Sequence, residues 1–244
     1  MPGPRSPIAL PASWLTEGHA WLRDGAAQLP GLAGVLALAA EWDGLPRDPY
    51  LRDGGRYRWR RHGCFVHEPV AARLVAAPHR PHWQSTRYNA LHGGLQRHFE
   101  PLSPALANSA DFASLLVALG EAFAAVRAVP RWFIEAHPFR IDTTDGIGRP
   151  TPEGAHRDGV DFVAIVLVAR RGVRGGETRV FPAEGAGGGQ RFTMTRPGET
   201  LLLDDARVVH ETTPIQPQLP GERGWRDTLV LTYRAGGFQG PDGD

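Results

Sequence analysis

Residues 150–168, PTPEGAHRDGVDFVAIVLV, carry the two patterns from which the fold and the site are inferred. Val160–Val168 is a nearly continuous apolar run, and its length predicts a strand. His156 and Asp158 lie just before it, two residues apart. Side chains at that spacing on an extended segment project to the same face, because strand side chains alternate. We therefore expect an imidazole and a carboxylate side by side at the rim of a strand.

A second, distant histidine can complete a metal site with this pair. His210 follows a turn, the apolar stretch Thr200–Leu203 and an acidic turn. A lone histidine is more often a surface or core residue, and a His-x-Asp pair alone is a weak signal. Two histidines and one carboxylate together occupy one side of an octahedron and leave the other side open, which suits Fe(II). The predicted metal ligands are His156, Asp158 and His210, and the predicted chemistry is oxygen activation by iron.

The pattern of elements predicts an α+β fold. Its expected core is a double-stranded β-helix, or jelly roll, with N-terminal and flanking helices and a metal site at its mouth. Apolar residues at helical spacing predict helices over Ser13–Leu29, Gly31–Trp42 and Ser109–Val126, the last with Asp111 as N-cap. Gly- and Pro-rich turns separate the predicted strands. These strands are 131–141, 160–168, 177–181, 190–195, 200–203 and 228–233, with Gly185–Gly189 as a hairpin tip.

Length favours one domain over residues 1–244. Within it we expect a helical N-terminal extension over 1–45 and a mixed helical and extended support over 46–130, which is a lid candidate. The catalytic jelly roll is expected over 131–236.

The composition of the chain limits the kinds of molecule that we expect it to bind. The formal net charge is +1, which does not favour a nucleic-acid or membrane partner. One cysteine, Cys64, excludes an intramolecular disulfide and fits a reducing compartment. We expect a soluble cytoplasmic protein that acts on a small-molecule substrate, and its oligomeric state stays open. The alternating segment Arg56–Arg61 is consistent with a solvated strand face, an anion clamp or, less well, a nucleic-acid patch.

A strand near the C-terminus offers a second anchoring point. Arg226 and Thr228 are two residues apart, so they share a face. A guanidinium can pair with a carboxylate through two hydrogen bonds, and a hydroxyl can add a third. This set suits the distal carboxylate of a 2-oxo diacid bound to iron. Arg234 on the same strand face is the competing candidate, and Arg223 is a weaker one.

The ordered motifs resemble the bacterial Fe(II)/2-oxoglutarate dioxygenases typified by L-isoleucine dioxygenase. The resemblance rests on Pro150–Gly154, His156-x-Asp158-Gly159, Arg170, Gly175–Thr178, His210 with Thr213–Ile215, and Arg226-Asp227, and upstream on Asp48, Tyr50, Arg56–Arg58, Gln84, Asn89 and Gly93-Gly94. It implies His156, Asp158 and His210 as iron ligands, Arg226 as the 2-oxoglutarate anchor, and Fe(II), 2-oxoglutarate and O2 as cofactors.

The resemblance also implies hydroxylation of a free amino acid or a related small metabolite, with decarboxylation of 2-oxoglutarate to succinate and CO2. Such a substrate needs a cation for its carboxylate and an acceptor for its ammonium group. The candidates are Arg140, Arg58, Glu153, Gln84 and Asn89, and His137 is a candidate substrate-facing or supporting residue.

Three alternatives stay open at this point. The same cofactors can support desaturation or oxidative cyclisation, whereas halogenation is disfavoured because Asp158 is present. A non-catalytic jelly-roll module could bind a metal or a metabolite. A hydroxylase acting on protein or nucleic acid would need an open, charged groove.

Overall fold

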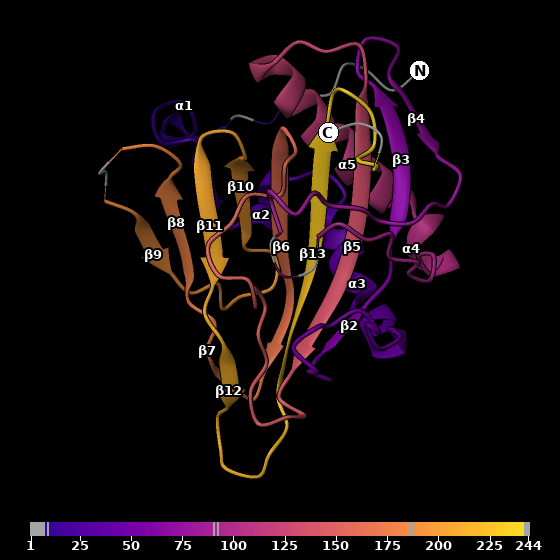
Figure 1. Ribbon diagram of the computed structural model, residues 1–244. Coiled ribbons are helices and arrows are strands. Elements are labelled where there is room, and N and C mark those ends of the chain that lie inside the picture. The colour runs from indigo at the N-terminus through magenta and orange to yellow at the C-terminus, as the bar shows by residue number, and fades with distance from the viewer. Residues whose placement is uncertain (1–7, 9, 90, 92, 186–187, 242–244) are drawn as a thin grey trace.

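The framework of the computed structural model is a large antiparallel sheet that faces two smaller sheets (Figure 1). The structure describes residues 8, 10–89, 91, 93–185 and 188–241. In the eight-stranded sheet the order is β1(His19–Leu22), β10(Thr200–Asp204), β6(Phe162–Arg171), β13(Trp225–Arg234), β5(Trp132–Asp142), β3(Gly63–Glu68) and β4(Arg73–Ala76), with β2(Arg58–Arg60) also paired to β5.

The smaller sheets form the second layer. One has the order β11(Val208–Thr212), β8(Thr178–Pro182) and β9(Gln190–Phe192), and the other pairs β12(Ile215–Pro217) with β7(Val173–Gly175). All strand pairs in both layers are antiparallel. This is the predicted double-stranded β-helix, and the fold class is confirmed. The hairpin expected at Gly185–Gly189 joins β8 and β9, although residues 186–187 lie outside the described residues.

Helices cover the outer face of the large sheet. The described helices are α1(Ala12–Glu17), α2(Gly25–Gln28), α3(Leu32–Ala37), η1(Ala39–Gly44), α4(Pro104–Ala107) and α5(Ala110–Val126). The long α5 packs against α3 and the sheet. The expected N-cap at Asp111 is wrong: the Ser109 hydroxyl accepts the Phe112 N–H at 3.2 Å, and Asp111 lies in the first turn.

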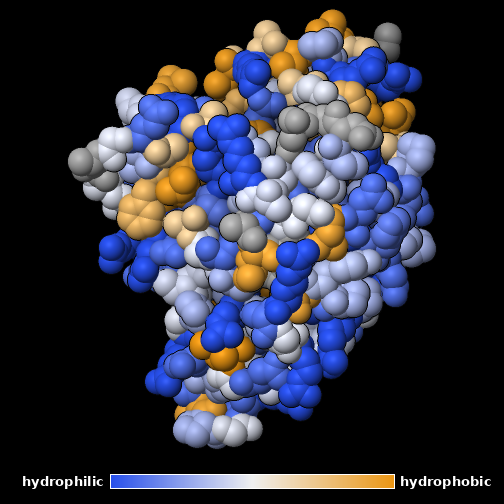
Figure 2. Space-filling model, in the orientation of Figure 1, coloured by the Kyte–Doolittle hydropathy of each residue, from blue (hydrophilic) through white to orange (hydrophobic). Residues whose placement is uncertain are grey.

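From Phe162 to Val168, strand β6 is apolar because it is buried on both faces. Phe162, Ala164 and Val166 pack in the core under the helices, whereas Val163 and Ile165 pack in a second core between the two layers. Strand alternation thus divides one apolar run between two cores. The face in Figure 2 is mostly hydrophilic, with hydrophobic residues in small separate groups. None of the described helices is long and apolar enough to cross a membrane.

The N-terminal helix predicted over Ser13–Leu29 is wrong. Gly18, with φ of 73°, ends α1, and His19–Leu22 then pairs with β10 as an edge strand. Tertiary pairing outweighs local helical periodicity here. The second predicted helix, Gly31–Trp42, is interrupted: α3 ends at Ala37 and the 3-10 helix η1 follows.

The turn after β10 holds the loop that precedes β6. The buried Asp205 carboxylate accepts N–H groups from three successive residues: Asp158 at 2.9 Å, Gly159 at 2.8 Å and Val160 at 3.1 Å. Gly159 has φ of 77°, and a Cβ there would lie 2.4 Å from the Tyr88 ring. The backbone around Asp158 is therefore held by the Asp205 carboxylate and by the packing of Gly159 against Tyr88.

Replacing Asp205 should loosen this loop. In Asp205→Asn an NH2 group must face at least one of the three N–H donors, so we expect the free energy of unfolding to fall by about 2 kcal/mol. Denaturant unfolding measures the change. Asp204→Asn, on the same turn, is the matched control and should stay within about 0.5 kcal/mol of wild type. Equal stability of the two variants would contradict the role of Asp205.

Candidate active site

A cavity of about 120 Å³ lies between the large sheet and β11. The inner faces of β5, β6 and β13 line one side, and β11 lines the other. Its lining residues are Arg58, Arg60, His82, Gln84, Asn89, His137, Phe139, Ile141, Pro150, Thr151, Glu153, His156, Ile165, His210, Thr212, Arg226, Thr228 and Val230.

Two of the three predicted metal ligands, His156 and His210, line this cavity, and Asp158 lies beside them. The backbones of His156 and His210 form an antiparallel bridge, with an N–H···O bond of 3.0 Å in each direction. The two imidazole rings lie 4.6 Å apart between centroids. His156 Nε2 is 3.8 Å from Asp158 Oδ1, and His210 Nε2 is 3.8 Å from Asp158 Oδ2. All three ligand atoms lie within 4.8 Å of one another.

Neighbouring groups fix the orientation of these side chains. His156 Nδ1 lies 2.9 Å from the Gly154 carbonyl, to which it donates, so Nε2 carries the free lone pair. The Gln84 amide donates to Asp158 Oδ1 at 3.3 Å, and its oxygen accepts from Arg97 Nη2 at 2.8 Å. Gln84 thus holds a metal-ligand candidate in place.

The pKa shifts of His156, Asp158 and His210 are consistent with a site for a metal cation. Burial lowers the pKa of His210 far below its usual value, so its imidazole is neutral and can donate a lone pair. Burial would also lower the pKa of His156, but the nearby carboxylates of Asp158 and Glu153 outweigh it and raise that pKa. Burial raises the pKa of Asp158. A divalent ion would compensate these buried carboxylates, and two imidazoles with one carboxylate are the donor set of non-heme Fe(II).

Arg226 is a buried cation that forms no ion pair with an acid among the described residues. It is 4% exposed, and its Nε and Nη2 have no hydrogen-bond partner among the described residues. Burial, together with neighbouring Arg170, lowers its pKa to about 10. Thr228 lies on the same strand face and also lines the cavity. An unpaired buried guanidinium is costly unless an anionic ligand binds it, so this position is suited to a carboxylate.

Two of the arginine candidates lie elsewhere. Arg140 does not line the cavity. Its register partner is Asp227, on the face of β13 opposite to Arg226, and Asp227 accepts two hydrogen bonds from it, of 2.8 and 2.7 Å. Arg234, the competitor of Arg226, donates to the Gly237 carbonyl at 3.0 Å and is also absent from the lining. Neither is placed to bind a ligand in this cavity.

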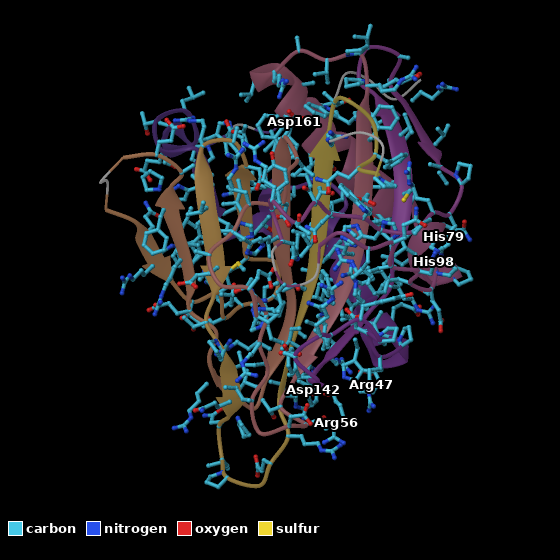
Figure 3. All side chains as sticks on the ribbon, in the orientation of Figure 1. Arg47, Arg56, His79, His98, Asp142 and Asp161 are labelled. Atoms are coloured by element: carbon cyan, nitrogen blue, oxygen red, sulfur yellow. The ribbon has the colours of Figure 1, made fainter. Side chains whose placement is uncertain are left out.

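The remaining substrate candidates line the cavity. Arg58 donates from Nε to Asp48 at 2.7 Å, and its Nη2 is buried without a partner among the described residues. Asn89 donates to Gln84 at 3.2 Å. Glu153 has one carboxylate oxygen, Oε2, that is buried and unpartnered in the described chain. Arg56, from the same basic segment, is held by Asp145 near the end of β5, where Figure 3 labels Arg56 and Asp142.

Sequence reasoning missed Arg60 and His82, which both line the cavity. Arg60 was predicted only as part of the alternating segment 56–61, and that alternation was the available signal. His82 lies in a segment without periodicity, so no pattern singled it out. Asp205 belonged to the acidic turn before His210, but its three backbone partners come from a loop 45 to 47 residues away.

Comparison with solved structures supports the fold. A bsmA homolog from Methylobium petroleophilum PM1 is 53% identical, with 93% of this chain and 92% of that chain covered and a TM-score of 0.86. IDO from Bacillus thuringiensis is 18% identical, over 91% and 96% of the two chains, with a TM-score of 0.73. The Fe(II)/(alpha)ketoglutarate-dependent dioxygenase TqaL is 20% identical, over 91% and 84%, with a TM-score of 0.68.

No curated protein matches this sequence. A model of the 2OG-Fe dioxygenase family, however, matches residues 39–232, which include both predicted metal-binding segments and Arg226. The cofactors of this family are Fe(II), 2-oxoglutarate and O2, as the sequence predicted. The chain belongs to the 2OG-Fe dioxygenase family and is an Fe(II)/2-oxoglutarate-dependent oxygenase.

Proposed function

We propose that this enzyme hydroxylates a free amino acid or an amino-acid-like small metabolite, with decarboxylation of 2-oxoglutarate to succinate and CO2. The observation that carries the proposal is that Arg226, whose Nε and Nη2 have no partner among the described residues, lines the same cavity as His156 and His210. The ligand atoms of these two histidines lie within 4.8 Å of Asp158. A single diacid could bridge these two points.

The proposed roles follow from the geometry. His156, Asp158 and His210 would hold iron, and Arg226 with Thr228 would hold the distal carboxylate of 2-oxoglutarate. Iron with 2-oxoglutarate supplies the oxidising chemistry when bound. The protein would orient the ligands through Gln84 and Asp205.

The opposite part of the cavity offers groups for an α-amino acid. The unpartnered Glu153 Oε2 can accept hydrogen bonds from an ammonium group. Arg58 Nη2 and Arg60 Nε are buried and lack partners among the described residues, so this wall can bind a carboxylate. Arg60 is clamped between the rings of Phe99 and Phe139, at 3.9 and 4.3 Å. Arg60 therefore replaces Arg140 as a proposed substrate anchor.

The size of the cavity supports a small substrate. A volume of about 120 Å³ leaves room for a small molecule only. We also propose a single domain, with the catalytic core over 131–236. Residues 46–130 supply Arg58, Arg60 and Gln84 to the cavity wall, which agrees with a supporting role.

A screen of free amino acids with Fe(II), 2-oxoglutarate and ascorbate tests the proposal by mass spectrometry. We expect succinate and a product heavier than its substrate by one oxygen atom. A product that has lost two hydrogens would instead indicate desaturation or oxidative cyclisation. Absence of succinate across the whole panel would sink the amino-acid assignment.

Removal of a proposed ligand should abolish iron binding. Anaerobic Fe(II) and 2-oxoglutarate should give the wild-type enzyme a weak visible charge-transfer band, and His156→Ala or His210→Ala should lack it while remaining folded. Absorption and circular dichroism measure the two properties. His98→Ala is the control, because His98 is exposed and does not line the cavity (Figure 3). A full band in His210→Ala would refute the ligand set.

Arg226→Met distinguishes a ligand anchor from a structural cation. Loss of one partner of a buried charge pair costs about 2–5 kcal/mol, so affinity for 2-oxoglutarate should fall roughly 30-fold or more. The cofactor-free variant should be at least as stable as wild type, because an uncompensated buried charge is removed. Calorimetric titration and thermal unfolding measure both quantities. Arg234→Met is the control; if it weakens 2-oxoglutarate binding more than Arg226→Met does, the assignment is wrong.

A further inference from the structure

A second group of buried side chains lies at the same cavity, and the proposed chemistry does not use it. It consists of His62, His82, Glu135 and His137, whose potential ligand atoms all lie within 4.8 Å of one another. Glu135 and His137 belong to β5, His62 directly precedes β3, and His82 forms a bridge with Arg97. His82 and His137 also line the cavity. The question is what their imidazoles present to a bound molecule.

The hydrogen bonds around Glu135 assign protons to two imidazoles. A carboxylate is only an acceptor when ionised. Glu135 Oε1 lies 2.9 Å from His62 Nε2 and 3.4 Å from His82 Nδ1, so both nitrogens carry hydrogen. Burial would raise the pKa of Glu135, but the facing His82 and His62 outweigh it and hold that pKa below its usual value. The lone pair of His82 is therefore on Nε2.

The hydrogen bond from Arg60 places the proton of His137 on Nε2, whereas the proton of His82 is on Nδ1. Arg60 Nη2 lies 2.7 Å from His137 Nδ1. A guanidinium has donors only, so Nδ1 must supply a lone pair and Nε2 must carry the hydrogen. Burial lowers the pKa of His137 far below its usual value and that of His82 to about 3, so both rings are neutral. One ring thus has a free acceptor, and the other a free donor.

This arrangement differs from that of a second metal site. Three imidazoles and a carboxylate are a suitable donor set by composition. However, Arg60 occupies the single lone pair of neutral His137, and the N–H groups of His62 and His82 are directed at Glu135. His79, at the edge of the molecule in Figure 3, is engaged with the Phe99 carbonyl at 2.8 Å. The lone pairs of the cluster therefore do not converge on one point.

We propose that His82 and His137 form a donor–acceptor pair on the cavity wall that binds a neutral hydrogen-bonding group of the substrate, namely a hydroxyl or a carboxamide. The two rings are 4.7 Å apart between centroids, with an interplanar angle of 69°. The His82 lone pair disfavours an anion, and the His137 N–H disfavours a cation. The inference rests on the proposed amino-acid function and narrows it: the side chain of the substrate is polar and uncharged.

The free-energy cost of binding an aliphatic side chain against these two nitrogens supports the proposal. A purely aliphatic side chain would displace water from both nitrogens without replacing its hydrogen bonds. Each polar atom that is left buried and unpaired reduces affinity. A site built to bind a hydroxyl or amide rejects an analogue that lacks it more strongly than a hydrophobic pocket rejects an extra methylene.

Matched pairs of amino acids test the proposal directly. Enzyme loaded anaerobically with Fe(II) and 2-oxoglutarate is titrated by calorimetry with L-homoserine against L-norvaline, and with L-asparagine against L-leucine. We expect the polar member of at least one pair to bind about tenfold tighter or more, which corresponds to about 1.4 kcal/mol. Preference for the aliphatic member of both pairs, with 2-oxoglutarate turnover, would overturn this inference and leave the amino-acid function intact. Binding of none of the four would overturn both.

Variants locate the preference on the two rings. His82→Leu and His137→Leu should lose the preference and keep the Fe(II)/2-oxoglutarate charge-transfer band. His82→Gln, whose amide oxygen can accept, should retain part of it. His79→Leu is the matched control and should keep the full preference. Metal analysis supplies a measurement that needs no substrate: a second equivalent of bound metal that persists in His156→Ala and disappears in His82→Leu would overturn the assignment of the lone pairs.

Discussion

Two backbone hydrogen bonds between His156 and His210 are the constraint on which the rest of the site depends. They join the loop that precedes β6 to strand β11, and so connect the two layers of the β-helix at one point. Asp205 fixes the same loop from the turn between β10 and β11. The imidazole and carboxylate groups therefore converge because the backbone is held, and the candidate metal site is largely preformed by the polypeptide.

The two ends of the cavity differ in how their charges are compensated. At Arg226 a buried cation has no acid partner in the part of the chain that the structure describes, which favours a diacid cofactor. At the Glu135 end, Glu135 accepts hydrogen bonds from His62 and His82, and Arg60 donates from Nη2 to His137, so that His82 presents an acceptor and His137 a donor. Beside this neutral pair, the Nε of Arg60 has no partner among the described residues and can bind the substrate carboxylate.

Sequence indicated the metal-binding half better than the substrate half, for physical reasons. His156 and Asp158 were predictable because strand periodicity alone places them on one face, and Arg226 because its strand alternates. The β1 strand was mistaken for a helix because its partner, β10, is some 180 residues away in the chain. Arg140 does not line the cavity, because its register partner Asp227 binds it on the opposite face of β13. Local sequence does not reveal that register. His82 and Asp205 act through long-range contacts that no local pattern encodes.

The most direct test of the central claim is an anaerobic crystal structure of the enzyme with iron and 2-oxoglutarate, using anomalous scattering at the iron edge. We expect one anomalous peak between His156, Asp158 and His210, and a 2-oxoglutarate carboxylate against Arg226. An anomalous peak among His62, His82 and Glu135, or 2-oxoglutarate bound away from Arg226, would contradict it.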